Sequence, residues 1–264
     1  MARVLITGCS TGIGRATAIE LAARGHEVVA TARRPETLDD LDVDVRLALD
    51  VDDEESIREA VAAAGRIDVL VNNAGYEVSG PIEKVPVDAV RAMFETNFFG
   101  AVRMVQAVVP AMRERGDGVI VNVSSIAGRV AAPLNGFYAS SKFALEAVSE
   151  AMHYELNHFG IRTVVIEPGL IETAFSGSIR HIGKDSPPYD ELDGMWSGAN
   201  EALVPAGRPG PDLVARAIAD AIADPSAALR HPVGSDAEMI ASTRASMTDA
   251  EFESTMRAVL GLAW

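Results

Sequence analysis

The sequence predicts an α/β fold: a doubly wound parallel sheet of about seven strands, with helices on both faces, in a single domain. Short apolar runs alternate with amphipathic helical patterns between residues 3 and 223, and this alternation is typical of parallel sheets. The first apolar run ends in a glycine-rich turn, Gly8-Cys9-Ser10-Thr11-Gly12-Ile13-Gly14, which leads directly into a helical pattern. That order of elements is the one a dinucleotide-binding unit requires.

The individual elements follow from where the apolar runs and the helical patterns start and stop. We expect strands at residues 3–7, 27–31, 45–49, 67–71, 119–123, 162–166 and 228–233. Helical patterns cover residues 53–65, 87–115, 143–159 and 211–223, and two short acidic helices are expected within 236–262. The long 87–115 pattern contains Asn97 and Gly100, which both weaken a helix at that place.

Length and composition limit the class of protein. With 264 residues, 48% of them hydrophobic, the chain can bury one large core, and no linker-like tract divides it. The single cysteine, Cys9, excludes an internal disulfide and favours a reducing cytoplasm, while the apolar N-terminal run is too short for a secretory signal. A net charge of -15 opposes binding to nucleic acid or anionic membranes. We therefore expect a cytoplasmic protein with a small-molecule substrate and no membrane insertion.

Ligands of doubly wound folds bind beyond the carboxyl ends of the strands. The residues that fall at those ends here are Gly8, Ala32, Asp50, Asn72, Ser125 and Pro168. The glycine turn can bring backbone amides close to a pyrophosphate at a helix N-terminus, although a tight turn needs glycines for itself. Asp50 could accept a hydrogen bond from adenine or only cap the next helix, and Asn72-Asn73-Ala74-Gly75 suits either cofactor approach or an ordinary turn.

The end of the second strand bears on the choice of cofactor. An acidic residue there usually holds the ribose 2'-hydroxyl of NAD. This chain has Ala32-Arg33-Arg34 instead, and guanidinium groups match a 2'-phosphate. We expect NADP, with NAD still possible; the alternative is a solvated turn carrying incidental charge.

The candidate chemistry lies between residues 122 and 146. Ser124 and Ser125 precede Tyr138, and Lys142 follows Tyr138 by four residues, on the same face of a helix. A free phenol titrates near ~10, and an adjacent ammonium favours the phenolate. We therefore expect Lys142 to lower the pKa of Tyr138; the alternative is a surface pair at helical spacing.

Residues 170–209 interrupt the regular alternation of strands and helices. Gly, Pro and Ser are scattered there among Phe175, Ile179, Ile182, Tyr189, Leu192, Met195, Trp196 and Leu203. Long irregular segments are often lids, so we expect a substrate-binding loop over an apolar substrate. A packing flap is the alternative.

Across nearly its whole length the chain resembles the classical short-chain dehydrogenase/reductase family. The resemblance rests on motifs in the family's order: Thr7-Gly8-x3-Gly12-Ile13-Gly14, Asp50, Asn72-Asn73-Ala74-Gly75, Asn97, Ser125, Tyr138-x3-Lys142 and Pro168-Gly169 with Thr173. It implies that Tyr138 is the acid/base and Ser125 orients the substrate oxygen. It also implies that Lys142 holds the nicotinamide ribose and that Asn97 completes a proton relay through water.

The resemblance implies further contacts and partners. The cofactor would be held by Gly8, Ser10, Gly12, Ile13, Gly14, Arg33, Asp50, Val51, Asn73, Ala74, Gly75, Tyr138, Lys142, Pro168, Gly169, Ile171 and Thr173. A Rossmann-like fold and a homodimer or homotetramer are also implied by the resemblance. Thr7-Gly8-Cys9-Ser10 and Ala30-Thr31-Ala32-Arg33 are similar to the 17β-hydroxysteroid and retinol dehydrogenase branch, in which Ser10 and Arg33 would contact the 2'-phosphate.

Other functions fit the sequence less well. The five histidines show no ligand-like spacing, so no metal site is expected. A noncatalytic NADP sensor would usually lack the Tyr138/Lys142 pair. A 3-oxoacyl reductase acting on carrier- or coenzyme-A-bound substrates is the rival within the family; the acidic composition opposes an acidic carrier protein.

Overall fold

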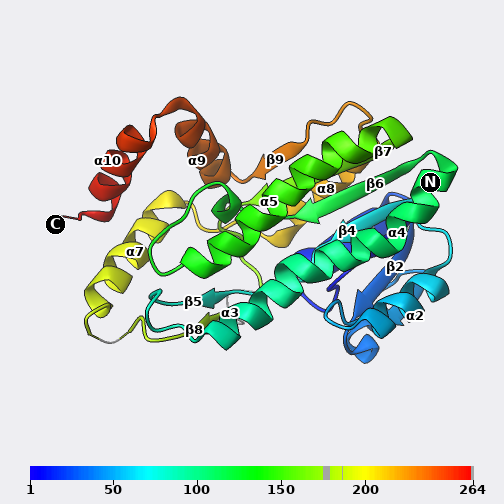
Figure 1. Cartoon of the computed structure of the whole chain (residues 1–264), viewed down its shortest axis with the longest axis horizontal. Helices are drawn as coiled ribbons and strands as arrows, with labels where there is room; N and C mark the ends of the chain where they lie inside the picture. Colours follow the sequence, from blue (N-terminus) through cyan, green and yellow to red (C-terminus); the bar gives the residue numbers. More distant parts are fainter. Residues whose placement is uncertain (175–178, 186, 263–264) are drawn as a thin grey trace.

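The computed structural model describes residues 1–174, 179–185 and 187–262, and its centre is a parallel sheet of seven strands (Figure 1). The strand order is β3-β2-β1-β4-β6-β7-β9, with the crossover between β3 and β4 expected of a doubly wound sheet. The predicted fold class is confirmed. The strands are β1 (Arg3–Ile6), β2 (Glu27–Ala32), β3 (Val45–Ala48), β4 (Val69–Asn72), β6 (Gly118–Val123), β7 (Ile161–Pro168) and β9 (Arg230–Val233).

Alternate residues of the central strands enter two separate cores. Val4 and Ile6 of β1 pack on the side of α1 (Gly12–Ala23) and α8 (Pro211–Ala223). Leu5 packs on the opposite side, against α2 (Glu54–Ala64), α4 (Ala101–Arg115) and α5 (Gly136–Leu156). Because both faces are covered, these strands read as continuous apolar runs.

The predicted helix at 87–115 is one continuous rod with an irregular centre. It consists of α3 (Val87–Phe94), a π-helical segment η2 (Glu95–Gly100) and α4. The wider turn occurs at Asn97 and Gly100, where the sequence weakens an α-helix, and π-helical turns are frequent at functional sites.

A buried polar chain ties the sheet to α5. Asn72 Nδ2 donates to Asn122 Oδ1 over 2.9 Å, and Asn122 Nδ2 donates to Ser149 Oγ over 2.8 Å. Ser149 Oγ in turn donates to the Leu145 carbonyl over 2.6 Å. Pairing buried polar groups in this way avoids a large desolvation cost, and it sets the position of α5 relative to β4 and β6.

The segment 170–209 is more regular than the sequence predicts. It contains a short strand, β8 (Arg180–His181), and a helix, α7 (Asp190–Leu203). The prediction of an irregular loop is therefore wrong over α7, where Asp190, Glu191 and Asp193 favour the helix N-terminus despite two glycines. Phe175, one of the predicted apolar lid residues, lies outside the described residues.

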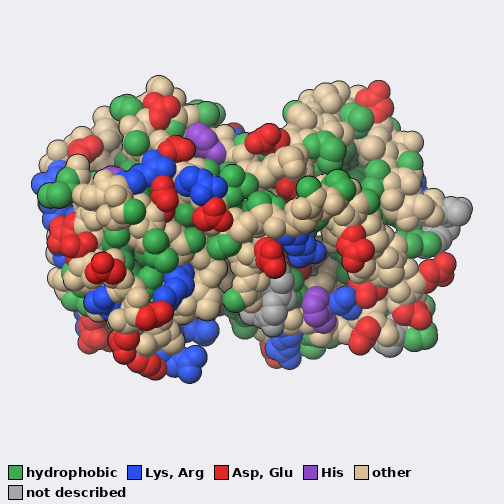
Figure 2. All heavy atoms as spheres, turned by 180° about the vertical axis from the view of Figure 1, so that it is seen from behind, with side chains coloured by type: hydrophobic (Ala, Val, Ile, Leu, Met, Phe, Trp, Pro, Cys, Tyr) green, Lys and Arg blue, Asp and Glu red, His purple; other side chains and the backbone are tan. Residues whose placement is uncertain are grey.

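The strand β8 forms a second small sheet with β5 (Val78–Ser79), beside α3 (Figure 1). Two C-terminal helices follow the main sheet: α9 (Ser235–Ser246) and α10 (Asp249–Leu260), which begins with a capping box between Thr248 and Glu251. Seen from behind, the upper edge of the molecule is notched between the part that carries the C-terminal helices and the rest of the body (Figure 2). Among the described residues, none of the helices combines the length and the apolar character that crossing a bilayer requires.

Replacing Ile120 by alanine tests the packing of the sheet. Ile120 is fully buried in the central strand β6, and removing such a side chain leaves a cavity that costs about 2–5 kcal/mol. We expect urea denaturation to show a fall of that size in the free energy of unfolding. Ile19→Ala on α1 is the matched control, because Ile19 is 53% exposed. Equal losses in the two variants would contradict this account of the core.

Cys9 is predicted to be chemically inert in the folded protein. Its side chain is fully buried in the core, Sγ lies 3.3 Å from the Ile6 carbonyl, and burial raises the pKa of Cys9 to about 12. Because the thiolate is the reactive form, we expect iodoacetamide to label Cys9 only after denaturation. Rapid labelling of the native protein, measured by mass spectrometry, would show that the thiol is accessible.

Candidate active site

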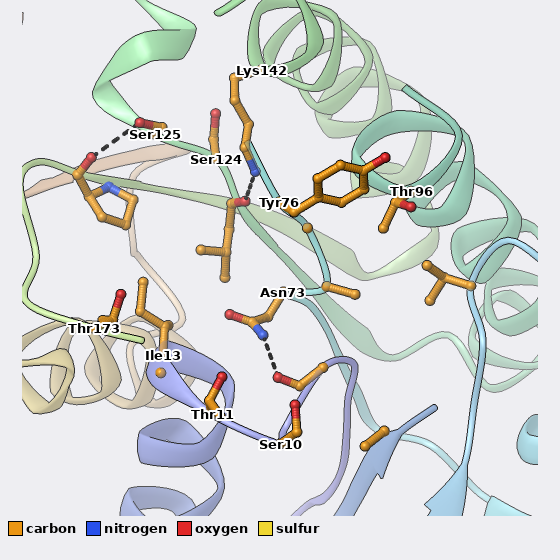
Figure 3. Close-up of a pocket in the computed structure, with 18 of the residues that line it drawn as sticks. Ser10, Thr11, Ile13, Asn73, Tyr76, Thr96, Ser124, Ser125, Lys142 and Thr173 are labelled. Atoms are coloured by element: carbon orange, nitrogen blue, oxygen red, sulfur yellow. Dashed lines mark hydrogen bonds between the residues drawn. The ribbon is translucent and has the colours of Figure 1, made fainter. Parts of the chain in front are cut away.

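A cavity of about 650 Å³ lies at the carboxyl ends of the parallel strands. Its wall includes residues from both halves of the sheet, as the doubly wound topology requires. Figure 3 shows the glycine turn at one side of this cavity and Ser125 and Lys142 at the other. The predicted site residues that line it are Gly8, Ser10, Gly12, Ile13, Arg33, Asp50, Val51, Asn73, Ala74, Gly75, Ser125, Tyr138, Lys142, Pro168, Gly169, Ile171 and Thr173.

The glycine turn is shaped by backbone conformations that only glycine adopts easily. Gly8 and Gly12 have φ of +75° and +59°. Asn73 fastens the turn to β4, because its Nδ2 donates to the Thr7 carbonyl over 2.9 Å and to the Gly8 carbonyl over 3.1 Å (Figure 3). Gly14 does not line the cavity; a Cβ there would collide with Asn73 and with the Gly8 carbonyl. Its contribution is close packing of α1 behind the turn.

The loops after β2 and β3 form the next part of the wall. Ala32 and Arg33 line the cavity. Asp50 also lines it, and its Oδ1 accepts a hydrogen bond from Asp52 N over 3.1 Å. The N-cap of α2 is Asp53, so the alternative reading of Asp50 as the helix cap is wrong. This leaves the Asp50 side chain facing the cavity.

Three further residues of this wall have no counterpart in the sequence prediction. Asp52, Tyr76 and Thr96 line the cavity. Thr96 Oγ1 donates to Asp52 Oδ2 over 2.8 Å, which joins η2 to the loop after β3, and Tyr76 lies next to Thr96 in Figure 3. The three come from separate segments, so no local pattern in the sequence could have placed them together.

Ser125, Tyr138 and Lys142 come together at the other end of the cavity. Ser125 caps a short 3-10 turn, η3 (Ile126–Gly128), by accepting from Ala127 N over 3.1 Å. Lys142 is 5% exposed; its Nζ donates to the Val123 carbonyl over 3.0 Å and lies 5.7 Å from the centroid of the Tyr138 ring. The alternative of a surface Tyr-Lys pair is wrong, because both side chains are buried.

The electrostatics of this group differ from the prediction. Burial raises the pKa of Tyr138, the Glu77 carboxylate adds to the increase, and a hydrogen bond with Ser125 opposes it. Burial also lowers the pKa of Lys142 to about 8. The pKa of Tyr138 is therefore raised, not lowered as the Tyr138/Lys142 spacing predicted, because loss of hydration is the largest cause of its shift. At neutral pH the phenol keeps its proton.

Asn97 lies behind the cavity wall rather than in it. Its Oδ1 accepts from Tyr76 N, and its Nδ2 donates to the Tyr76 carbonyl, each over 2.9 Å. Nδ2 also donates to Ser141 Oγ over 3.1 Å. The Asn97 side chain thus clamps the segment after β4 to η2 and α5, and its polar atoms are engaged in doing so.

The loop after β7 closes the cavity beside the glycine turn (Figure 3). Thr173 lies against Gly12, where a Cβ would be 3.5 Å away. A Cβ at Gly169 would collide with the Asp236 carboxylate, and Asp236 Oδ2 accepts from Leu170 N over 2.6 Å. No local pattern indicates that Asp236, at the start of α9, holds this loop.

The residues present fit a dinucleotide. The glycine turn leads into α1, whose N-terminus favours a phosphate. Arg33 and Asp50 line the part of the cavity that would face a ribose and an adenine in such folds. A side chain at Gly75 would crowd Asn97, because its Cβ would lie 3.0 Å from Asn97 Oδ1. The backbone there stays open to close approach by a ligand.

Comparison with known proteins agrees with the geometry. Residues 2–182 match the family model described as short chain dehydrogenase. Human retinol dehydrogenase 8 is 42% identical over 189 residues, which cover 67% of this chain and 61% of that protein.

Solved structures of the same family superpose on nearly the whole chain. A short-chain dehydrogenase from Streptomyces avermitilis gives a TM-score of 0.85 at 34% identity, covering 100% of this chain and 98% of the other. One from Burkholderia cenocepacia, in complex with NADP, gives 0.78 at 28% identity over 98% and 97%. The chain therefore belongs to the short-chain dehydrogenase/reductase family of oxidoreductases, which use a nicotinamide cofactor.

Proposed function

We propose that the protein transfers a hydride between NADP(H) and the carbonyl or secondary alcohol carbon of a small apolar substrate. The observation that carries the proposal is that Ser125, Tyr138 and Lys142 line the same cavity as the glycine turn. A proton donor and a dinucleotide cradle thus share one cavity, which is the arrangement that carbonyl reduction needs.

Each polar group then has a defined role. The nicotinamide, when bound, supplies or accepts the hydride. Tyr138 donates a proton to the substrate oxygen in reduction and removes it in oxidation, and Ser125 holds that oxygen by a hydrogen bond. Because the raised pKa of Tyr138 keeps the phenol protonated at neutral pH, it is ready to act as a donor, and we expect alcohol oxidation to accelerate as the pH rises.

The preference for NADP rests on the loop after β2. Arg33 lines the cavity next to Ala32, and an acidic residue that would repel a 2'-phosphate is missing from that position. Ser10 of the glycine turn lines the same region of the cavity.

The apolar substrate is supported by the elements beyond Tyr138. A buried cluster of Val78, Val85, Ala89 and Met93 packs around Tyr138, and Ile182 of the 170–209 segment joins it. Retinol dehydrogenase 8 is named for an apolar alcohol. We propose that the 170–209 segment covers the substrate.

Replacing Tyr138 by phenylalanine should remove the proton donor without emptying the cavity. General acid–base groups contribute roughly 10²–10⁴-fold to rate, and we expect turnover to fall by that factor while NADPH still binds, as measured by steady-state kinetics and cofactor fluorescence. The matched control is Tyr154→Phe on the same helix, where the side chain is 72% exposed. Turnover near the wild-type value in Tyr138→Phe would remove Tyr138 from the mechanism.

Replacing Arg33 by alanine should weaken NADPH specifically. A hydrogen bond to a charged group contributes about 1.5–3 kcal/mol, which corresponds to roughly 10–150-fold in Kd. We expect that loss for NADPH and no loss for NADH, which lacks the 2'-phosphate, in calorimetric titrations. Arg91→Ala, at an exposed ion pair with Asp88 on α3, is the control. Tighter binding of NADH than NADPH by the wild-type protein would refute the preference.

A further inference from the structure

Asp236 is a buried carboxylate that lies outside the cavity and holds part of the cavity wall. Its side chain belongs to the first turn of α9, and the residue is 2% exposed. A first-turn acid commonly interacts with the N-terminus of its own helix. The Oδ2 atom of Asp236 instead accepts a hydrogen bond from Leu170 N, in the loop after β7, over 2.6 Å. The carboxylate is therefore directed at a segment that is distant in sequence.

Two glycines make room for this carboxylate. A Cβ at Gly169 would lie 2.2 Å from Asp236 Oδ2, and a Cβ at Gly234 would lie 2.7 Å from Asp236 Oδ1. Gly234 also has a φ of +108°, which residues with a side chain rarely adopt. The carboxylate thus packs directly against the backbone of the loop, and the loop cannot shift toward α9 without a collision.

A second hydrogen bond joins the loop to the same C-terminal segment. Gly169 N donates to the Val233 carbonyl over 3.0 Å, next to the bond from Leu170 N to Asp236. The Val233 acceptor is a main-chain carbonyl, which no substitution removes. The Asp236 acceptor belongs to a side chain, so the dependence of the loop on this segment can be tested there.

The segment that holds the loop is itself anchored on α5. Arg230 Nε donates to Glu146 Oε2 over 2.9 Å, and Arg230 Nη2 donates to Glu150 Oε2 over 2.6 Å. Tyr138 belongs to the same helix as both glutamates. Residues 230–236 therefore fix the loop after β7 relative to the helix that carries the proposed proton donor.

The loop lines the cavity between the proposed reaction centre and the glycine turn. Ser125 Oγ lies 3.5 Å from the Pro168 carbonyl, and Thr173 lies against Gly12 at the other end of the loop (Figure 3). The proposed hydride transfer places the nicotinamide at the Ser125 end of the cavity and the adenosine beside Arg33. The loop would then face the nicotinamide half of the cofactor.

We propose that Asp236 is a positioning residue for the nicotinamide half of the cofactor. It accepts from Leu170 N and so keeps the loop in the conformation that lines the cavity, which makes cofactor affinity depend on a helix outside the cavity. This inference rests on the proposed function, because that function decides which half of the cofactor faces the loop. Without the carboxylate, the cofactor must order the loop as it binds, and binding is weaker.

Two substitutions separate the hydrogen bond from the charge. Asp236→Ala removes the acceptor, whereas Asp236→Asn removes the charge and keeps an acceptor oxygen. In calorimetric titrations of Asp236→Ala we expect the Kd for NADPH to rise about tenfold or more, with little change for 2',5'-ADP, the adenosine half of NADPH. Asp236→Asn should stay close to the wild-type protein with both ligands.

A matched control and a second pair of ligands complete the titrations. Asp249→Ala removes an exposed first-turn carboxylate from the next helix, α10, and should leave both affinities unchanged. NADH and its adenosine half, AMP, should show the same pattern as NADPH and 2',5'-ADP. The result is then independent of the choice between the two cofactors.

Amide exchange in the wild-type protein tests the inference without any variant. Because cofactor binding and loop order are linked reciprocally, NADPH should slow exchange of the Leu170 amide about tenfold or more, measured by NMR, whereas 2',5'-ADP should not. Equal losses for NADPH and 2',5'-ADP in Asp236→Ala, equal losses in the Ala and Asn variants, or exchange at Leu170 that NADPH leaves unchanged would each overturn the inference. Failure of the wild-type protein to bind NADPH or NADH would refute the proposed function itself, and this inference with it.

Discussion

Alternate residues of each central strand pack against helices on opposite faces of the sheet, and the arrangement of the cavity depends on this two-sided burial. Leu5 enters one core while Val4 and Ile6 enter the other. Because neither face of the central strands reaches water, the polar side chains of these strands can meet solvent or a ligand only at the strand ends. All seven strands run in parallel, so their carboxyl ends converge on one edge, and the cavity lies there.

The polar groups that do reach the interior are held in networks that fix their direction. Asn122 and Ser149 link the sheet to α5. This link sets the position of α5, the helix that carries Tyr138 and Lys142. The polar atoms of the Asn97 side chain form hydrogen bonds that hold the segment after β4 in place. These buried hydrogen bonds position the reacting groups. The low dielectric of the protein interior shifts the pKa values of those groups.

That shift has a consequence for the chemistry. Burial holds Tyr138 in its protonated form and brings the pKa of Lys142 down to about 8, whereas the local spacing had predicted an acidified phenol. Glu77 adds to the same tendency from a segment that is distant in sequence from Tyr138.

The sequence by itself determined the sheet and the glycine turn, and it placed Ser125 at the end of a strand and Tyr138 and Lys142 on one face of a helix, because those features depend on periodicity and short-range spacing. It also located the irregular turn at Asn97, where local helix propensity is weak. Only the tertiary structure decided the direction of the pKa shifts and the helix within residues 170–209. It alone brought Asp52, Tyr76 and Thr96 to one wall and Glu77 to Asn135. Desolvation and contacts between distant segments act through three-dimensional packing, which no local pattern records.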